Sequence, residues 1–148
     1  MGKVVIDGTN QILGRLASLV AKKLLSGEQV VVVNAEKIVV SGNPKMVIES
    51  YKKLFQVSTL RNPERTGIRR PRTPVRLFKA AVKGMLPKNK PRGREALKRL
   101  RVYIGVPPEY ADAEKVRFQE ADVSRLKGRY ITLGDVALQM GWKGVHRV

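Results

Sequence analysis

The first sixty residues alternate between short apolar runs and amphipathic stretches. Residues 4–6 and 30–33 are unbroken runs of β-branched side chains, which is typical of strands covered on both faces of a sheet. Between them, apolar residues recur every three or four positions over residues 13–24. This spacing predicts an amphipathic helix that ends at Ser26-Gly27. A strand, a helix and a second strand in this order predict a right-handed βαβ unit.

Two further helices are predicted to begin where a polar residue precedes proline. Asn43-Pro44 and Thr73-Pro74 each offer an N-cap side chain followed by proline at the first helical position. The second of these helices has two distinct faces. Its expected apolar side consists of Val75, Phe78, Val82 and Met85. Its basic side follows the same spacing and consists of Arg72, Arg76, Lys79 and Lys83.

Shorter elements are predicted from weaker signals further along the chain. They are strands over residues 38–40 and 102–105, a basic turn over residues 88–93 and a helix over residues 94–100. Thr132 and Asp135 have the spacing of a capping box, ahead of a helix over residues 133–140 that Gly141 closes. Residues 109–128 are polar and show no periodicity that assigns them to an element.

The pattern breaks down between the two capped helices, over residues 56–73. Pro63, Gly67 and Pro71 interrupt regular structure there, and few side chains could contribute to a core. Arginines fill the same stretch, so we expect a basic Pro/Arg-rich arm or loop that becomes ordered only against a partner. The sequence as a whole therefore predicts a single α/β domain over residues 1–148 that carries this arm.

Charge is concentrated around the same stretch. The chain holds 30 basic and 12 acidic residues, a formal net charge of +18. Residues 61–101 alone contain ten Arg and five Lys against Glu64 and Glu95. This segment therefore carries +13 of the total, and a polyanionic partner is the first expectation.

Composition excludes most catalytic chemistry. The chain has no cysteine, and its single histidine is His146, so thiol catalysis and multi-histidine or cysteine metal sites are excluded. Gly8 and Gly14 flank the turn after the first strand without forming a dinucleotide or P-loop motif. We interpret this turn as a tight βα connection, although an RNA phosphate could still approach the helix start. No apolar run is long enough for a membrane span and no signal peptide is recognised, so the cytoplasm is the expected location.

One enzymatic alternative remains open at this stage. Asp7 ends the first strand and Glu36 follows the second, so the two carboxylates could meet at one edge of a sheet and bind Mg²⁺ in an RNA-processing enzyme. Turn-forming and surface roles are the more common explanation for isolated carboxylates. A resident metal or cofactor is therefore not expected.

The basic segment also limits the mode of nucleic-acid binding. No aromatic residue lies between Phe55 and Phe78, whereas single-strand binders stack bases on aromatic side chains. Zinc fingers, basic leucine zippers and helix-turn-helix motifs have no counterpart in the sequence. These observations favour recognition of the shape and backbone of folded RNA.

The middle of the chain closely resembles a known family signature. It comprises Val82-Lys83-Gly84-Met85-Leu86-Pro87, then Gly93-Arg94, then Leu100-Arg101-Val102-Tyr103-Ile104-Gly105. In this order and spacing the motifs resemble those of large-subunit ribosomal protein L13. Asp7-Gly8 and the segments at 13–18 and 31–35 are similar to the family as well. Val106-Pro107-Pro108 replaces the His-Pro-His element of bacterial members, and the chain is shorter than eukaryotic ones, so the resemblance favours the archaeal type.

The resemblance implies a three-layer α/β/α fold around a small, mainly parallel sheet. It implies a non-catalytic constituent of the large ribosomal subunit that binds 23S rRNA, neighbours other large-subunit proteins and supports early subunit assembly. Residues 83–87 would approach the rRNA. Together with the charge pattern, this gives the following expected rRNA-binding residues: Arg61, Arg65, Arg69, Arg70, Arg72, Arg76, Lys79, Lys83, Lys88, Lys90, Arg92 and Arg94. Nothing in the sequence supports a regulatory role outside the ribosome.

Overall fold

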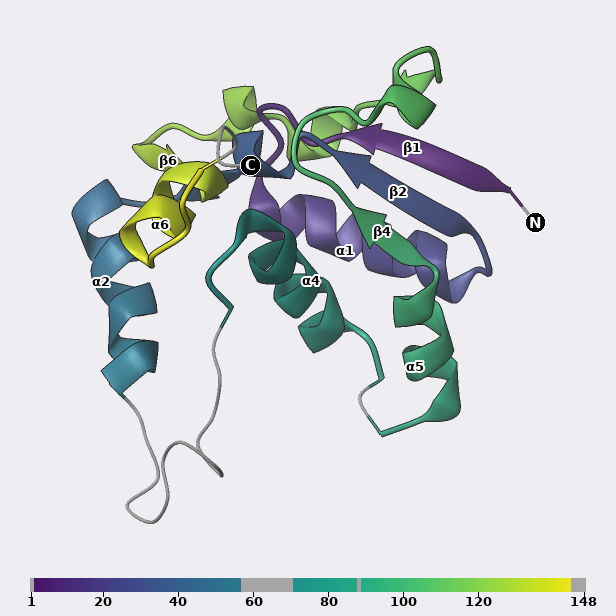
Figure 1. Ribbon diagram of the computed structural model, residues 1–148, viewed down its shortest axis with the longest axis horizontal. Coiled ribbons are helices and arrows are strands. Elements are labelled where there is room, and N and C mark those ends of the chain that lie inside the picture. The colour runs from purple at the N-terminus through teal and green to yellow at the C-terminus, as the bar shows by residue number, and fades with distance from the viewer. Residues whose placement is uncertain (1, 57–70, 88, 145–148) are drawn as a thin grey trace.

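The valine-rich runs form the centre of a parallel sheet in the computed structural model, which describes residues 2–56, 71–87 and 89–144 (Figure 1). Four strands pair in the order β4-β2-β1-β5, and each of these pairings is parallel. The strands are β1 (Lys3–Asp7), β2 (Gln29–Val33), β4 (Leu100–Val102) and β5 (Lys115–Val116). Parallel strands need crossover connections, so the segments between them cover the faces of the sheet.

Three helices cover one face of this sheet: α1 (Leu13–Leu25), α4 (Pro74–Met85) and α5 (Pro91–Lys98) (Figure 1). The helix α1 buries Leu16, Val20 and Leu24 in the core, as the spacing of its apolar residues predicts. The predicted strand-helix-strand unit is therefore confirmed as β1-α1-β2. Burial of these aliphatic side chains supplies the main stabilisation of the fold.

The opposite face of the sheet carries a thinner layer. Val5, Val31 and Val33 pack there with Tyr110 of the short 3₁₀ helix η2 (Pro108–Tyr110). Tyr103 and Ala113 pack against the same cluster. The sheet therefore lies between two layers, which explains why β1 and β2 are apolar without alternation. The expected three-layer α/β/α fold around a small, mainly parallel sheet is confirmed.

A second, two-stranded sheet lies at the other end of the molecule (Figure 1). Its antiparallel strands are β3 (Val39–Ser41) and β6 (Tyr130–Thr132), and the helices beside it are α2 (Pro44–Gln56) and α6 (Leu133–Gln139). The 3₁₀ helix η1 (Ala35–Lys37) joins this part to the main sheet and contacts α6. Gly134 permits that contact, because a Cβ atom there would lie 2.9 Å from the Glu36 carbonyl oxygen.

The capping signals of the sequence are confirmed at three helices. The Thr73 Oγ1 atom accepts a hydrogen bond of 3.3 Å from the Arg76 backbone N–H at the start of α4. The Thr132 Oγ1 atom accepts one of 3.3 Å from the Asp135 N–H at the start of α6. At α2, the Asn43 Oδ1 atom accepts one of 3.1 Å from the Lys45 N–H. Each bond satisfies a backbone donor that the first turn of a helix leaves unpaired.

The apolar side of α4 differs in part from the prediction. Phe78 and Val82 are buried as expected, but Met85 is 45% exposed and Leu77, at 4% exposure, joins the core instead. Adjacent apolar residues on α4 allow two alternative stripes that differ by a rotation about the helix axis. The helix α4 packs against α1, α6 and η1, and this packing selects the stripe that contains Leu77.

The elements after α4 begin earlier than predicted. The helix α5 starts at Pro91 rather than at residue 94, so residues 91–93 are helical and not part of a turn. Leu100 is the first residue of β4, which covers residues 100–102 instead of 102–105. Proline at the first helical position is the local signal that indicates this start.

The unassigned region 109–128 supplies the last strand of the main sheet. It contains β5 and two 3₁₀ helices, η3 (Gln119–Ala121) and η4 (Val123–Arg125). Its 3₁₀ helices have local backbone hydrogen bonds, but two further bonds reach distant residues: the Ile12 N–H donates to the Ala121 carbonyl oxygen at 2.6 Å, and the Val123 N–H donates to the Asn10 carbonyl oxygen at 2.9 Å. The conformation of this region is set by distant backbone partners, which explains its lack of periodicity.

Candidate nucleic-acid interface

The basic side of α4 points away from the core. Arg76 and Lys83 are exposed and Lys79 is partly exposed, while Leu77, Phe78 and Val82 are buried. The two faces follow from the helical period, because residues three or four apart lie on the same side of a helix. The predicted basic stripe of α4 is therefore confirmed from Arg76 to Lys83.

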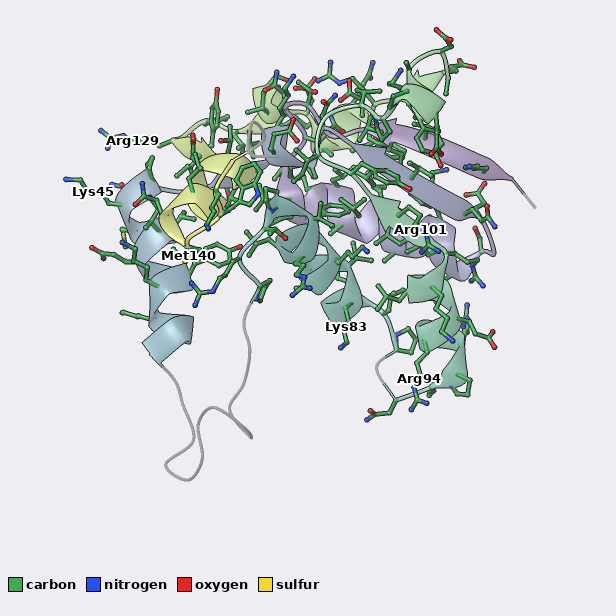
Figure 2. The ribbon with its side chains drawn as sticks, in the orientation of Figure 1. Lys45, Lys83, Arg94, Arg101, Arg129 and Met140 are labelled. Carbon is green, nitrogen blue, oxygen red and sulfur yellow. The ribbon has the colours of Figure 1, made fainter. Side chains whose placement is uncertain are left out.

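The helix α5 adds a second set of cations next to α4. Lys90, Arg92 and Arg94 are exposed at its start. The first turn of α5 packs closely against the loop after α4 at Gly93. Only glycine fits there, because a Cβ atom would lie 1.9 Å from the Pro87 carbonyl oxygen. Figure 2 shows Lys83 and Arg94 on the side of the molecule that is remote from the sheet. We call the set Arg76, Lys79, Lys83, Lys90, Arg92 and Arg94 the basic face.

The cations of the basic face are not neutralised within the described part of the chain. The ion pair found there joins Lys23 to Glu28 at 3.7 Å, on and just after α1. The first turns of both α4 and α5 contain no acidic residue. An uncompensated cluster of exposed Arg and Lys side chains attracts anions, and arginine can donate two parallel hydrogen bonds to one phosphate.

Arg72 occupies a different position from the one its spacing predicted. It precedes the first residue of α4, and its Nη1 atom donates a hydrogen bond of 2.7 Å to the Met140 carbonyl oxygen at the C-terminal end of α6. A guanidinium group is favourable at this end of a helix because the last carbonyl groups carry partial negative charge. Arg72 therefore joins α6 and does not continue the stripe of α4. The remaining expected contacts lie outside the described residues: Arg61, Arg65, Arg69, Arg70 and Lys88.

The carboxylates considered for Mg²⁺ binding have structural partners. The Asp7 Oδ1 atom accepts hydrogen bonds from the Thr9 N–H, the Thr9 hydroxyl group and the Asn34 side-chain amide, at 3.0, 2.7 and 3.0 Å. The Glu36 Oε2 atom accepts one of 3.0 Å from the Gly105 N–H. These bonds organise the loops at the carboxyl ends of β1 and β2. Across residues 2–56, 71–87 and 89–144, no three acidic or histidine side chains are grouped as metal ligands would be.

The glycine-containing turn after β1 is a packed βα connection. The Gly8 N–H donates to the Val33 carbonyl oxygen at 2.9 Å, and a Cβ atom at Gly8 would lie 2.8 Å from the Ile38 side chain. Gln11 is completely buried, and its Oε1 atom accepts a hydrogen bond of 3.1 Å from the Phe118 N–H. Region 109–128 therefore covers this turn, in agreement with its interpretation as a tight connection.

Comparison with known proteins assigns the family. Residues 2–109 match the family model of ribosomal protein L13. The chain belongs to the ribosomal protein L13 family. It is 60% identical over 142 residues to the large ribosomal subunit protein uL13 of Aeropyrum pernix, covering 96% of this chain and 92% of that protein. The uL13 proteins of Saccharolobus solfataricus and Methanococcoides burtonii are 49% and 46% identical, over 95% and 94% of this chain and 94% and 98% of their own lengths.

Membership of the L13 family confirms the resemblance that the motifs indicated, including its archaeal type. L13 proteins are structural constituents of the large ribosomal subunit and not enzymes, which removes the RNA-processing alternative. As a ribosome component, an archaeal L13 protein lies in the cytoplasm. Within the described residues, no helix combines the length and apolarity needed to cross a bilayer.

In this L13 protein, Asp7 should make stability depend on pH. Burial raises the pKa of its carboxyl group, but the hydrogen bonds from Thr9 and Asn34 and the charge of Arg117 outweigh burial, so the pKa is lowered overall. Ionised Asp7 therefore stabilises the fold above about pH 4, the pKa of an unfolded Asp, and this contribution disappears as the pH falls through the folded-state pKa.

The Asp7→Asn variant should be less stable than the wild type by about 1 kcal/mol at pH 7, because a charged acceptor is removed. The difference should shrink as the pH falls below about 4. Urea denaturation at pH 7, 4, 3 and 2 measures it. Asp112→Asn, at an exposed position, is the matched control. A stability difference for Asp7→Asn that does not change with pH would contradict the role of the ionised carboxyl group.

Proposed function

We propose that this L13 protein binds 23S rRNA through the basic face and the arm over residues 56–73, and that it supports early assembly of the large subunit without catalysis. The observation that carries the proposal is the exposure of cations on α4 and α5, of which Lys83 and Arg94 lie on the side remote from the sheet (Figure 2), with no ion pair to any of them in the described part of the chain. Phosphates of folded RNA are the anions that such a surface fits.

The arrangement favours recognition of RNA shape. The cations project from two helices that are anchored by buried side chains, so the backbone positions that carry them are set by the fold. Fixed phosphate contacts position a protein on an RNA fold without reading its bases. Arg61, Arg65, Arg69, Arg70 and Lys88, which belong to the same basic segment of the sequence, are part of the proposal as further phosphate contacts.

The charge of the chain supports the proposed role in assembly. A protein with a formal net charge of +18 neutralises part of the phosphate repulsion that opposes RNA compaction. Contacts with neighbouring large-subunit proteins are part of the same proposal. Reconstitution of large subunits with and without the protein tests the role: its omission should cause immature particles to accumulate, whereas normal subunit yield would contradict it.

The salt dependence of RNA binding tests the basic face directly. We expect the Arg76→Gln/Lys83→Gln/Arg94→Gln variant to lower the slope of log K against log[salt] by about 0.9 for each phosphate of a duplex-like region that the protein no longer neutralises. The measurement uses a transcript of the Aeropyrum pernix 23S rRNA, since that relative is 60% identical.

The matched control for this measurement removes three exposed cations from other elements. It is Lys22→Gln/Lys52→Gln/Lys127→Gln, with one position each on α1, on α2 and in the loop before β6. The control should change the slope by less than the basic-face variant. Equal slopes for the two triple variants would show that total charge, and not the basic face, determines binding.

A further inference from the structure

A second cationic site lies away from the basic face, at the end of the main sheet where β1, β2 and β4 begin. It is a cleft of about 190 Å³ on the same side of the sheet as η2. Four cations line it, together with two tyrosines. They are Lys3, Lys98, Arg99, Arg101, Tyr103 and Tyr110. The parallel strand order brings these residues together from distant parts of the sequence.

Aromatic rings position the cation on β1. The Lys3 Nζ atom lies 4.9 Å from the centroid of the Tyr110 ring. The Tyr110 ring in turn packs against Tyr103, with 5.8 Å between ring centroids. A ring face attracts an ammonium group without using its N–H donors. The Lys3 donors therefore stay available to an acceptor inside the cleft.

The arginines of the cleft bond to backbone carbonyl groups and not to carboxylates. The Arg99 Nη2 atom donates to the Leu24 carbonyl oxygen at 2.6 Å, near the C-terminal end of α1. The Arg101 Nη1 atom donates to the carbonyl oxygens of Lys98 and Leu100 at 3.1 and 3.2 Å. The ion pair recorded for the described residues lies on Lys23, outside the cleft. The cleft therefore carries an uncompensated positive charge, which a concave surface concentrates.

The size of the cleft indicates what it can hold. Its volume of about 190 Å³ is below the roughly 300–1,000 Å³ of pockets that enclose a whole small-molecule ligand. A single anionic group that projects from a larger partner fits such a space better. An exposed cation links the basic face to this separate cleft, because Lys98, which lines the cleft, is exposed one helical turn after Arg94 on α5. Figure 2 shows Arg94 at the far end of α5 and Arg101 beside the sheet.

We propose that this cleft binds a backbone phosphate of an RNA strand that passes along α5 from Arg94 towards β4. Lys3 and Arg101 would donate to the phosphate oxygens, and Lys98 would contact the preceding part of the backbone. Arg99 is a positioning residue, because its guanidinium group joins the start of β4 to the end of α1. This inference rests on the proposed function and adds to it a second contact, centred outside the basic face.

The Lys3→Gln/Arg101→Gln variant tests the cleft. Both side chains are exposed, so the variant should fold, which a melting temperature within a few degrees of the wild type would verify. With the Aeropyrum pernix 23S rRNA transcript, the slope of log K against log[salt] should fall by about 0.7 to 0.9 for each phosphate that is no longer neutralised. Hydroxyl-radical footprinting should show reduced protection at nucleotides that the basic-face variant still protects. Lys22→Gln/Lys127→Gln is the control that removes the same number of charges.

The outcomes separate this inference from the proposed function. An unchanged slope for the cleft variant, with a lowered slope for the basic-face variant, would overturn the cleft and leave the proposed function intact. Unchanged slopes for both variants would overturn both proposals. Reduced protection at the same nucleotides for both variants would mean that the cleft binds no RNA of its own. A normal RNA slope combined with release from large subunits at lower salt would assign the cleft to an acidic protein segment instead.

Discussion

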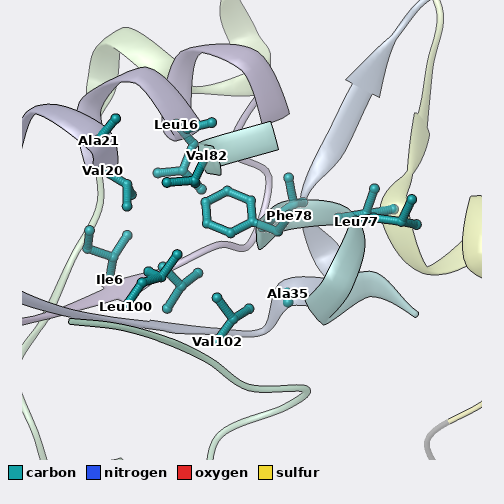
Figure 3. Close-up of a cluster of buried hydrophobic side chains, with 14 of the residues drawn as sticks. Ile6, Leu16, Val20, Ala21, Ala35, Leu77, Phe78, Val82, Leu100 and Val102 are labelled. Atoms are coloured by element: carbon teal, nitrogen blue, oxygen red, sulfur yellow. The ribbon is translucent and has the colours of Figure 1, made fainter. Parts of the chain in front are cut away.

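Replacement of Phe78 by alanine should lower the free energy of unfolding by about 3–5 kcal/mol, the usual cost of removing a fully buried phenylalanine. Phe78 is the largest of the completely buried side chains in the described part of the chain. Figure 3 shows its ring between Leu16 and Val82 on one side and the sheet residues on the other. The ring joins α1, α4 and the sheet, so alanine would leave a cavity that three elements would have to close.

This decrease is large compared with the stability of a small domain. A total of about 5–15 kcal/mol is typical, so the Phe78→Ala variant should lose a large share of its folding free energy. Urea denaturation followed by circular dichroism measures the decrease. Met85→Ala is the control on the same helix, because Met85 is 45% exposed and its truncation should cost no more than about 0.5 kcal/mol. Similar costs at the two positions would contradict the orientation of α4, in which Phe78 is buried and Met85 is exposed.

Replacement of Gly93 by alanine should destabilise the protein by about 2–3 kcal/mol, at the upper end of the usual cost of overpacking. The added Cβ atom would lie 1.9 Å from the Pro87 carbonyl oxygen and 2.8 Å from the Pro87 carbonyl carbon. Both clashing atoms belong to the backbone, so a change of side-chain rotamer cannot relieve the overlap. The start of α5 would have to move away from the end of α4.

The same substitution should weaken RNA binding through geometry alone, since it removes no charge. We expect a lower affinity for the 23S rRNA transcript together with the lower stability. Gly14→Ala is the matched control: Gly14 lies in the first turn of α1 with no atom near its Cβ position. Alanine there should be neutral or should stabilise the helix by up to about 1 kcal/mol. An equally well tolerated alanine at position 93 would show that α4 and α5 are not tightly joined.

Local chemistry made the central elements predictable. The valine runs, the caps Thr73 and Asn43, and the leucine spacing of α1 each determine structure through nearby atoms, so these predictions were confirmed. The predicted stripe of α4 is confirmed at Phe78 and Val82, but it includes the exposed Met85 and omits Leu77, because several adjacent residues are apolar and packing chooses among them. The start of α5 was missed because Gly93 suggests a turn, whereas its role is to allow close approach to Pro87.

Region 109–128 could not be predicted for a different reason. The strand β5 has only two residues, and its pairing partner β1 is far away in the sequence, so no local pattern marks it.

The two candidate sites differ in how far the sequence predicts them. The basic face between Arg76 and Lys83 follows from helical spacing, and the charge count located it. The cleft requires Lys3, Arg101 and Tyr110 to meet, and only the strand order of the sheet brings them together.

The strand order also has a consequence for the speed of folding. The register pairs Val5 with Lys115, so the sheet is complete only after two segments that are far apart in the sequence have met. Proteins dominated by such non-local pairs have a high contact order and fold in roughly milliseconds to seconds, more slowly than helical bundles. During that interval, the apolar residues of β1 and β2 and the basic residues 61–101 are all exposed to solvent. The free chain is therefore vulnerable to aggregation before its native contacts form.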